Sequence, residues 1–138
     1  MIDKIEQENK IKEANKITNM LEALSKIDVF ENTRKRQVVE VRSLLVYMLR
    51  EMENMTYHSI KDFFRSNGKD YDHSTAVYAH KNYEMYSMYN KKLDMYFNEI
   101  LQNSKSENSK KLLAKKLIDS NDAWVSEVLI YMMDKTLI

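Results

Sequence analysis

The chain has 138 residues, of which 43% are hydrophobic, with 22 Lys and Arg against 21 Asp and Glu. It has no cysteine, no proline and one glycine, which excludes a disulfide framework, a thiolate zinc site and the glycine-rich phosphate loops of nucleotide-binding proteins. So few turn-forming residues disfavour a β-sandwich, and no apolar run approaches the roughly 20 residues of a membrane span. We therefore expect an all-α cytoplasmic protein with no membrane anchor and no nucleotide cofactor.

The first half of the chain predicts helices that are joined by short polar turns. Apolar residues recur at helical spacing over three segments, 3–26, 34–52 and 57–65. IDVFENT (27–33) breaks the first period, and Thr33 and Thr56 are the expected N-caps of the two helices that follow. SNGKDY (66–71) is the strongest loop signal because it holds the only glycine, Gly68.

The second half predicts one long helix and a helical hairpin. Asp72 is the expected N-cap of a helix that runs without a break over 73–103. A polar, serine-rich stretch (104–110) separates it from two further helices, near 108–118 and 122–136.

This pattern predicts a helical domain over 1–103 and a C-terminal extension over 104–138. The apolar side chains of the extension either pack back on the long helix or form a homodimer interface. The sequence leaves these two alternatives open.

Every arginine lies between positions 34 and 65, whereas the lysines are scattered along the chain. The planar guanidinium of arginine suits phosphates and base edges, so this clustering points to nucleic acid despite a net charge of +1. The alternative is that these arginines serve ion pairs within the protein. The short helix, the glycine loop and the helix that follows it predict a helix-turn-helix. His73, Ser74 and Thr75 carry the short polar side chains that suit a first turn in the major groove.

Three segments resemble, in order and spacing, the DNA-binding domain of the bacterial replication initiator DnaA. They are TRKRQVVEVRSLLVYMLREM (33–52), the T-x-x-S-I stretch that begins at Thr56, and DHSTAVYAHKNYE (72–84). The resemblance covers about positions 17–84 and implies sequence-specific binding of double-stranded DNA. The base contacts that it implies are Arg34 in the minor groove and, in the major groove, Asp72, His73, Ser74 and Thr75.

Phosphate contacts are expected from a second set of residues, Lys35, Arg36, Arg42, Arg50 and Lys61. Lys61 departs from the family pattern, which has a glycine at that place, and Tyr71 stands where the family has an arginine. The loop between the two helices is about four residues longer, and no ATPase motif is present. We therefore expect different sequence specificity and no ATP-driven step.

The expected function is control of replication or transcription by a DnaA-like helix-turn-helix protein of a phage or mobile element, at the nucleoid. The alternative is a helical interaction module that kept the fold but not DNA binding, and that uses its Tyr- and Met-rich run (78–96) to bind a protein. No acidic pair stands out as catalytic, and neighbouring helical residues such as His73 and Ser74 do not face each other. The histidines lack a carboxylate partner at ligand spacing. We expect no enzyme activity, no metal and no cofactor.

Overall fold

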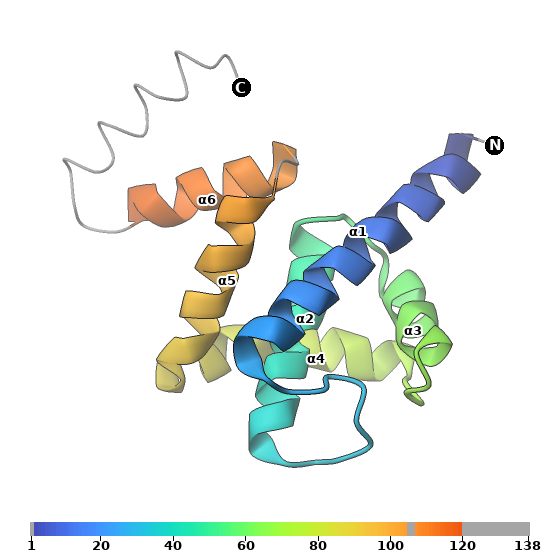
Figure 1. Ribbon diagram of the computed structural model, residues 1–138, viewed down its shortest axis with the longest axis horizontal. Helices are drawn as coiled ribbons and strands as arrows, with labels where there is room; N and C mark the ends of the chain where they lie inside the picture. Colours follow the sequence, from blue (N-terminus) through green and yellow to red (C-terminus); the bar gives the residue numbers. More distant parts are fainter. Residues whose placement is uncertain (1, 105–106, 120–138) are drawn as a thin grey trace.

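The computed structural model describes residues 2–104 and 107–119, and all regular structure in this part of the chain is α-helical. The described helices are α1 (Ile2–Ser25), α2 (Arg36–Glu51), α3 (Tyr57–Ser66), α4 (His73–Tyr89), α5 (Lys91–Asn103) and α6 (Glu107–Asp119) (Figure 1). The all-α class expected from the sequence is confirmed. None of these helices has the length and apolar character that a membrane crossing requires.

Helix α2 is the centre of the fold. It contacts every other described helix (Figure 1). Its apolar residues recur at steps of three and four, so one broad face is apolar. Leu44, Leu45, Val46, Met48 and Leu49 on this helix are fully buried. Because α2 is held on all sides, it fixes the position of the loop before it and of α3 after it.

Helices α3 and α4 pack against each other and against α2 across the connection 67–72. The predicted N-cap of α3 is confirmed, because the Thr56 hydroxyl accepts a hydrogen bond from the Ser59 backbone N–H at 3.1 Å. Gly68 has a φ of +83°, a left-handed conformation that favours glycine. Tyr71 ends the connection as a buried side chain whose ring stacks on Phe64 at 4.2 Å.

The expectation of one unbroken helix over 73–103 is wrong. Asn90 has an extended backbone (φ −119°, ψ 94°) that ends α4 and begins α5. Its side-chain oxygen accepts from the Lys92 N–H at 3.2 Å, and its amide donates to the Glu40 carboxylate at 3.2 Å. The break is therefore capped locally and tied to α2.

The expected N-cap at Thr33 is also wrong. Helix α2 begins at Arg36, its N-cap position is Lys35, and no side chain caps it. The Thr33 hydroxyl instead accepts from the Lys35 N–H at 3.2 Å and closes a turn before the helix.

The part of the expected C-terminal extension that is described, α6, packs against α5 and α2. Leu112 and Leu113 pack against the core, and Ala114 is buried. The second expected helix (122–136), and with it the predicted hairpin and homodimer interface, lies outside the described residues.

Candidate nucleic-acid interface

The first turn of α4 presents polar groups to solvent. Asp72 occupies the N-cap position, as predicted, but its carboxylate accepts no backbone N–H and instead accepts from the Ser74 hydroxyl at 3.4 Å. Asp72, His73, Ser74 and Thr75 are all exposed. The first backbone N–H groups of the helix have no intrahelical acceptor and no side-chain cap. This helix end is suited to a phosphate or to base edges.

Helix α3 places a basic face beside that turn. The His58 ring stacks on the His73 ring at 4.3 Å, which brings this face of α3 against the start of α4. Lys61 and Arg65 follow His58 at steps of three and four, so they lie on the same face. Arg65 Nε donates to the Tyr71 carbonyl at 2.8 Å and holds the connection that leads into α4.

The loop before α2 supplies further cations. Arg34 and Lys35 are exposed, and Lys69 Nζ donates to Asn32 Oδ1 at 3.2 Å, which ties this loop to the α3–α4 connection. Burial lowers the pKa of Lys69, and the nearby Arg42 and Arg34 lower it further, while Asp70 acts in the opposite direction. Lys69 therefore lies near Arg34 and Arg42 and joins the loop before α2 to the α3–α4 connection.

Two predicted phosphate contacts are already paired with carboxylates. Arg36 Nε lies 3.2 Å from the buried Glu40 carboxylate, although the arginine side chain is itself 77% exposed. Lys61 Nζ lies 3.6 Å from the exposed Asp62 carboxylate. The Lys61–Asp62 pair lies at the surface, where such pairs contribute only about 0–1 kcal/mol, so Lys61 can exchange its partner for a phosphate. Arg36 can keep Glu40 on Nε and donate to a phosphate from the rest of its exposed guanidinium.

Arg42 has a structural role. It is 8% exposed, and it donates from Nε to the Val29 carbonyl at 2.9 Å and from Nη2 to the Glu31 carbonyl at 2.7 Å. Burial lowers the pKa of Arg42. These contacts are at odds with the predicted phosphate contact, because the guanidinium points into the protein and holds the loop that carries Arg34. We leave Arg42 out of the interface.

Arg50 is also engaged, at the other end of α2. Its Nη1 donates to the Met55 carbonyl at 3.1 Å, and its guanidinium lies 4.5 Å from the centre of the Tyr57 ring. Tyr57 in turn lies 6.0 Å from His73. Arg50 is therefore next to the exposed turn but half-buried, with only part of its guanidinium left for a ligand.

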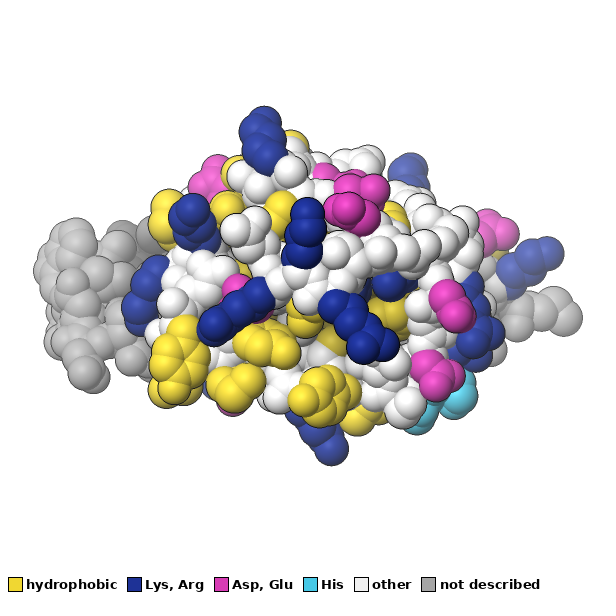
Figure 2. Space-filling model, turned by 90° about the horizontal axis from the view of Figure 1, so that it is seen from below, with side chains coloured by type: hydrophobic (Ala, Val, Ile, Leu, Met, Phe, Trp, Pro, Cys, Tyr) yellow, Lys and Arg dark blue, Asp and Glu magenta, His cyan; other side chains and the backbone are white. Residues whose placement is uncertain are grey.

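Figure 2 shows the face that carries this loop and α4. Lys and Arg side chains are spread over its middle, among acidic ones, and histidine side chains lie at its lower right edge. We define the candidate interface by its residues, which are Arg34, Lys35, Arg36, Lys61, Arg65, Lys69 and Asp72 to Thr75.

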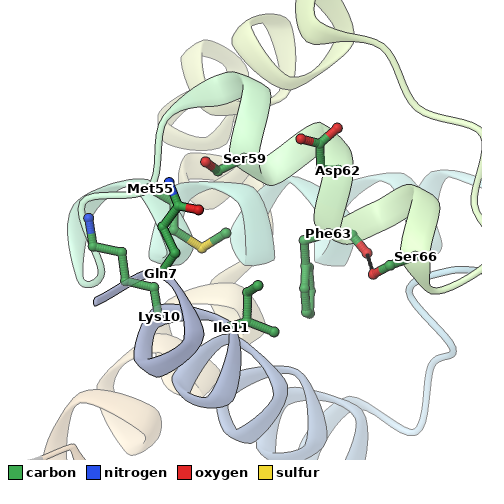
Figure 3. A pocket seen from close by; sticks show the side chains of 8 residues that line it. All are labelled: Gln7, Lys10, Ile11, Met55, Ser59, Asp62, Phe63 and Ser66. Atoms are coloured by element: carbon green, nitrogen blue, oxygen red, sulfur yellow. Dashed lines mark hydrogen bonds between the residues drawn. The ribbon is translucent and has the colours of Figure 1, made fainter. Parts of the chain in front are cut away.

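A groove of about 260 Å³ lies on the other side of α3, against α1 (Figure 3). Ile11 and Phe63 lie next to each other in it, with Lys10 on one side and Ser66 on the other. No residue of the candidate interface lines this groove, although Asp62, which does, is the ion-pair partner of Lys61.

His80 has a carboxylate partner that the sequence did not predict. Its Nε2 lies 2.9 Å from Glu51 Oε1, and its Nδ1 lies 3.2 Å from the Tyr57 hydroxyl. The expectation that the histidines lack such a partner is wrong here. Both ring nitrogens are engaged, so this arrangement links α2, α3 and α4. Within the described ranges, no group of three or more His, Asp or Glu side chains could hold a metal ion.

Two members of the interface, Arg65 and Lys69, are not among the contacts expected from the sequence. The step of four from Lys61 to Arg65 was the available signal for the first. The contact between Lys69 and Asn32 joins residues 37 apart, and no local pattern predicts it.

Comparison with protein-family models, with curated proteins and with solved structures finds no match to this chain.

Proposed function

We propose that this chain binds double-stranded DNA at a specific sequence, with α3 and α4 acting as a helix-turn-helix of the DnaA type. The observation that carries the proposal is the exposed, uncapped first turn of α4. His73, Ser74 and Thr75 would read base edges there, with Asp72 beside them, because short polar side chains at a helix start reach the floor of the major groove.

The cations around this turn support the proposal. Arg34 is assigned to the minor groove, next to the groove that α4 enters. Lys35 and Arg36 on one side, and Lys61 on the other, would bind phosphates, and Lys69 lies between the two groups. Phosphate contacts hold a protein in register, and base contacts then select the sequence. A protein that holds one duplex site in this way suits control of replication or transcription.

A second candidate function is favoured by a different observation. Tyr78, Met88 and Tyr89 on α4 are 67%, 68% and 74% exposed, an unusual exposure for large apolar side chains. In this second function, the chain binds another protein through these side chains of α4, whether or not it also binds DNA.

Binding of a fluorescent duplex at several salt concentrations tests the DNA-binding proposal. We expect Lys35→Ala and Lys69→Ala each to weaken binding and to reduce the slope of log K against log salt by about 1. The matched control is Lys12→Ala, which removes an exposed cation on α1, a helix that contributes no residue to the candidate interface. Equal effects in all three variants, or no binding at about 50 mM salt, would contradict the proposal.

A further inference from the structure

The outer face of α4 carries large apolar side chains that the described fold leaves in solvent. Met85 is 46% exposed, and Tyr78, Met88 and Tyr89 are more exposed still. Met95 on α5 is 66% exposed. Figure 2 shows apolar side chains gathered at the lower left and along the lower edge of this face. Together the four on α4 expose on the order of 500 Å², the size at which an apolar patch marks an interaction site.

The spacing on α4 indicates that the occupant of this face is a helix. Tyr78, Lys81, Met85 and Met88 follow one another at steps of three, four and three. This alternation keeps one seam of a helix turned toward a neighbouring helix. Lys81 is the polar member of the seam, and a single polar seam position sets the register of a helix pair.

We propose that the occupant is α4 of a second copy of this chain, in an antiparallel pair about a two-fold axis near residue 83. Lys81 and Glu84 are both exposed and lie three residues apart, with Lys81 in the seam and Glu84 at its edge. In the antiparallel pair, Lys81 of one copy is level with Glu84 of the other, and the two-fold axis makes the same contact twice. In a parallel pair, like charges would be level.

The same axis brings the apolar residues together. Tyr78 of one copy lies level with Met88 and Tyr89 of the other, and a thioether beside an aromatic ring is a favourable contact. The exposed area is below the roughly 800 Å² per partner of a standard stable interface. The dimer is therefore weak and forms with rising protein concentration.

Sedimentation equilibrium of the full chain without DNA tests the pairing, independently of the proposed function. We expect wild type to dimerise and Met88→Glu to dimerise at least tenfold more weakly. The control Ile5→Glu changes a residue that is equally exposed (67%) but lies on α1, and it should dimerise like wild type. A wild type that stays monomeric up to about 1 mM, or a Met88→Glu variant that dimerises like wild type, overturns the proposal. Because each site is exposed, thermal unfolding should be almost unchanged in both variants.

Charge exchange tests the register. Lys81→Glu and Glu84→Lys should each weaken the dimer severalfold, because each places like charges level with one another. The double variant restores opposite charges and should recover wild-type affinity. Failure of the double variant to recover overturns the antiparallel arrangement, as would full affinity in either single variant.

Discussion

Replacement of Arg42 by methionine separates a structural role from a phosphate contact. Methionine keeps much of the apolar stem of the side chain but loses both hydrogen bonds of the guanidinium. A hydrogen bond from a charged donor contributes about 1.5–3 kcal/mol. The Val29 carbonyl would lose its donor, while the Glu31 carbonyl would keep the Thr33 N–H at 3.0 Å. The substitution also relieves the cost of burying a charge, so we expect a net loss of about 2–4 kcal/mol.

Urea unfolding followed by circular dichroism measures this loss. Arg34→Met is the matched control, because Arg34 is exposed and its replacement should change the free energy of unfolding by less than about 0.5 kcal/mol. The salt slope of DNA binding is measured under conditions in which Arg42→Met is folded. It should equal the slope of wild type. An unchanged urea midpoint together with a reduced salt slope would show that Arg42 binds a phosphate, and would refute the structural role.

Further predictions concern Glu53, Asn90 and Arg34. Burial raises the pKa of Glu53 from 4.5 to about 7, and Glu13 adds repulsion. The folded protein therefore favours the neutral carboxyl, and its stability falls as the pH rises from about 4.5 to 7. The free energy of unfolding of Glu53→Gln should exceed that of wild type by on the order of 1–3 kcal/mol near pH 8 and should equal it near pH 4. An equal gain at the two pH values would contradict the burial of Glu53. Asn90→Ala removes a cap and a hydrogen bond to Glu40, and it should lower the free energy of unfolding by about 1–2 kcal/mol; an unchanged urea midpoint would exclude this role. Arg34→Ala should weaken duplex binding by roughly 1–3 kcal/mol without changing stability, and unaltered affinity would exclude a base contact.

Local sequence patterns predicted most of the helices, because apolar spacing and N-cap residues depend only on residues close together in the sequence. The helix predicted over 57–65 is observed as Tyr57–Ser66, and the Thr56 cap is confirmed. The break at Asn90 has no such signal, since apolar residues continue on both sides of it. The hydrogen bond that favours the break joins Asn90 to Glu40, fifty residues away, and depends on the packing of α4 against α2.

The candidate interface was predictable only in part. A polar N-cap sequence after a glycine loop predicts a helix that begins after Asp72, and α4 begins there, at His73. The burial of Arg42 could not be predicted, because an arginine between apolar helix positions is usually a surface residue. Its burial depends on the loop that contains Val29 and Glu31, which folds back over α2. The contact between His58 and His73 likewise depends on how α3 packs on α4.

Selection of bound sequences from a random duplex pool, at stated salt, tests the central claim most directly. Wild type and His73→Ala are compared, with His58→Ala as a control, because His58 contacts His73 but is not assigned to a base. We predict that wild type enriches one defined motif, that His73→Ala loses preference at part of that motif, and that His58→Ala keeps it. Binding that depends on salt but enriches no motif, or a motif that is unchanged in His73→Ala, would contradict base reading by the first turn of α4.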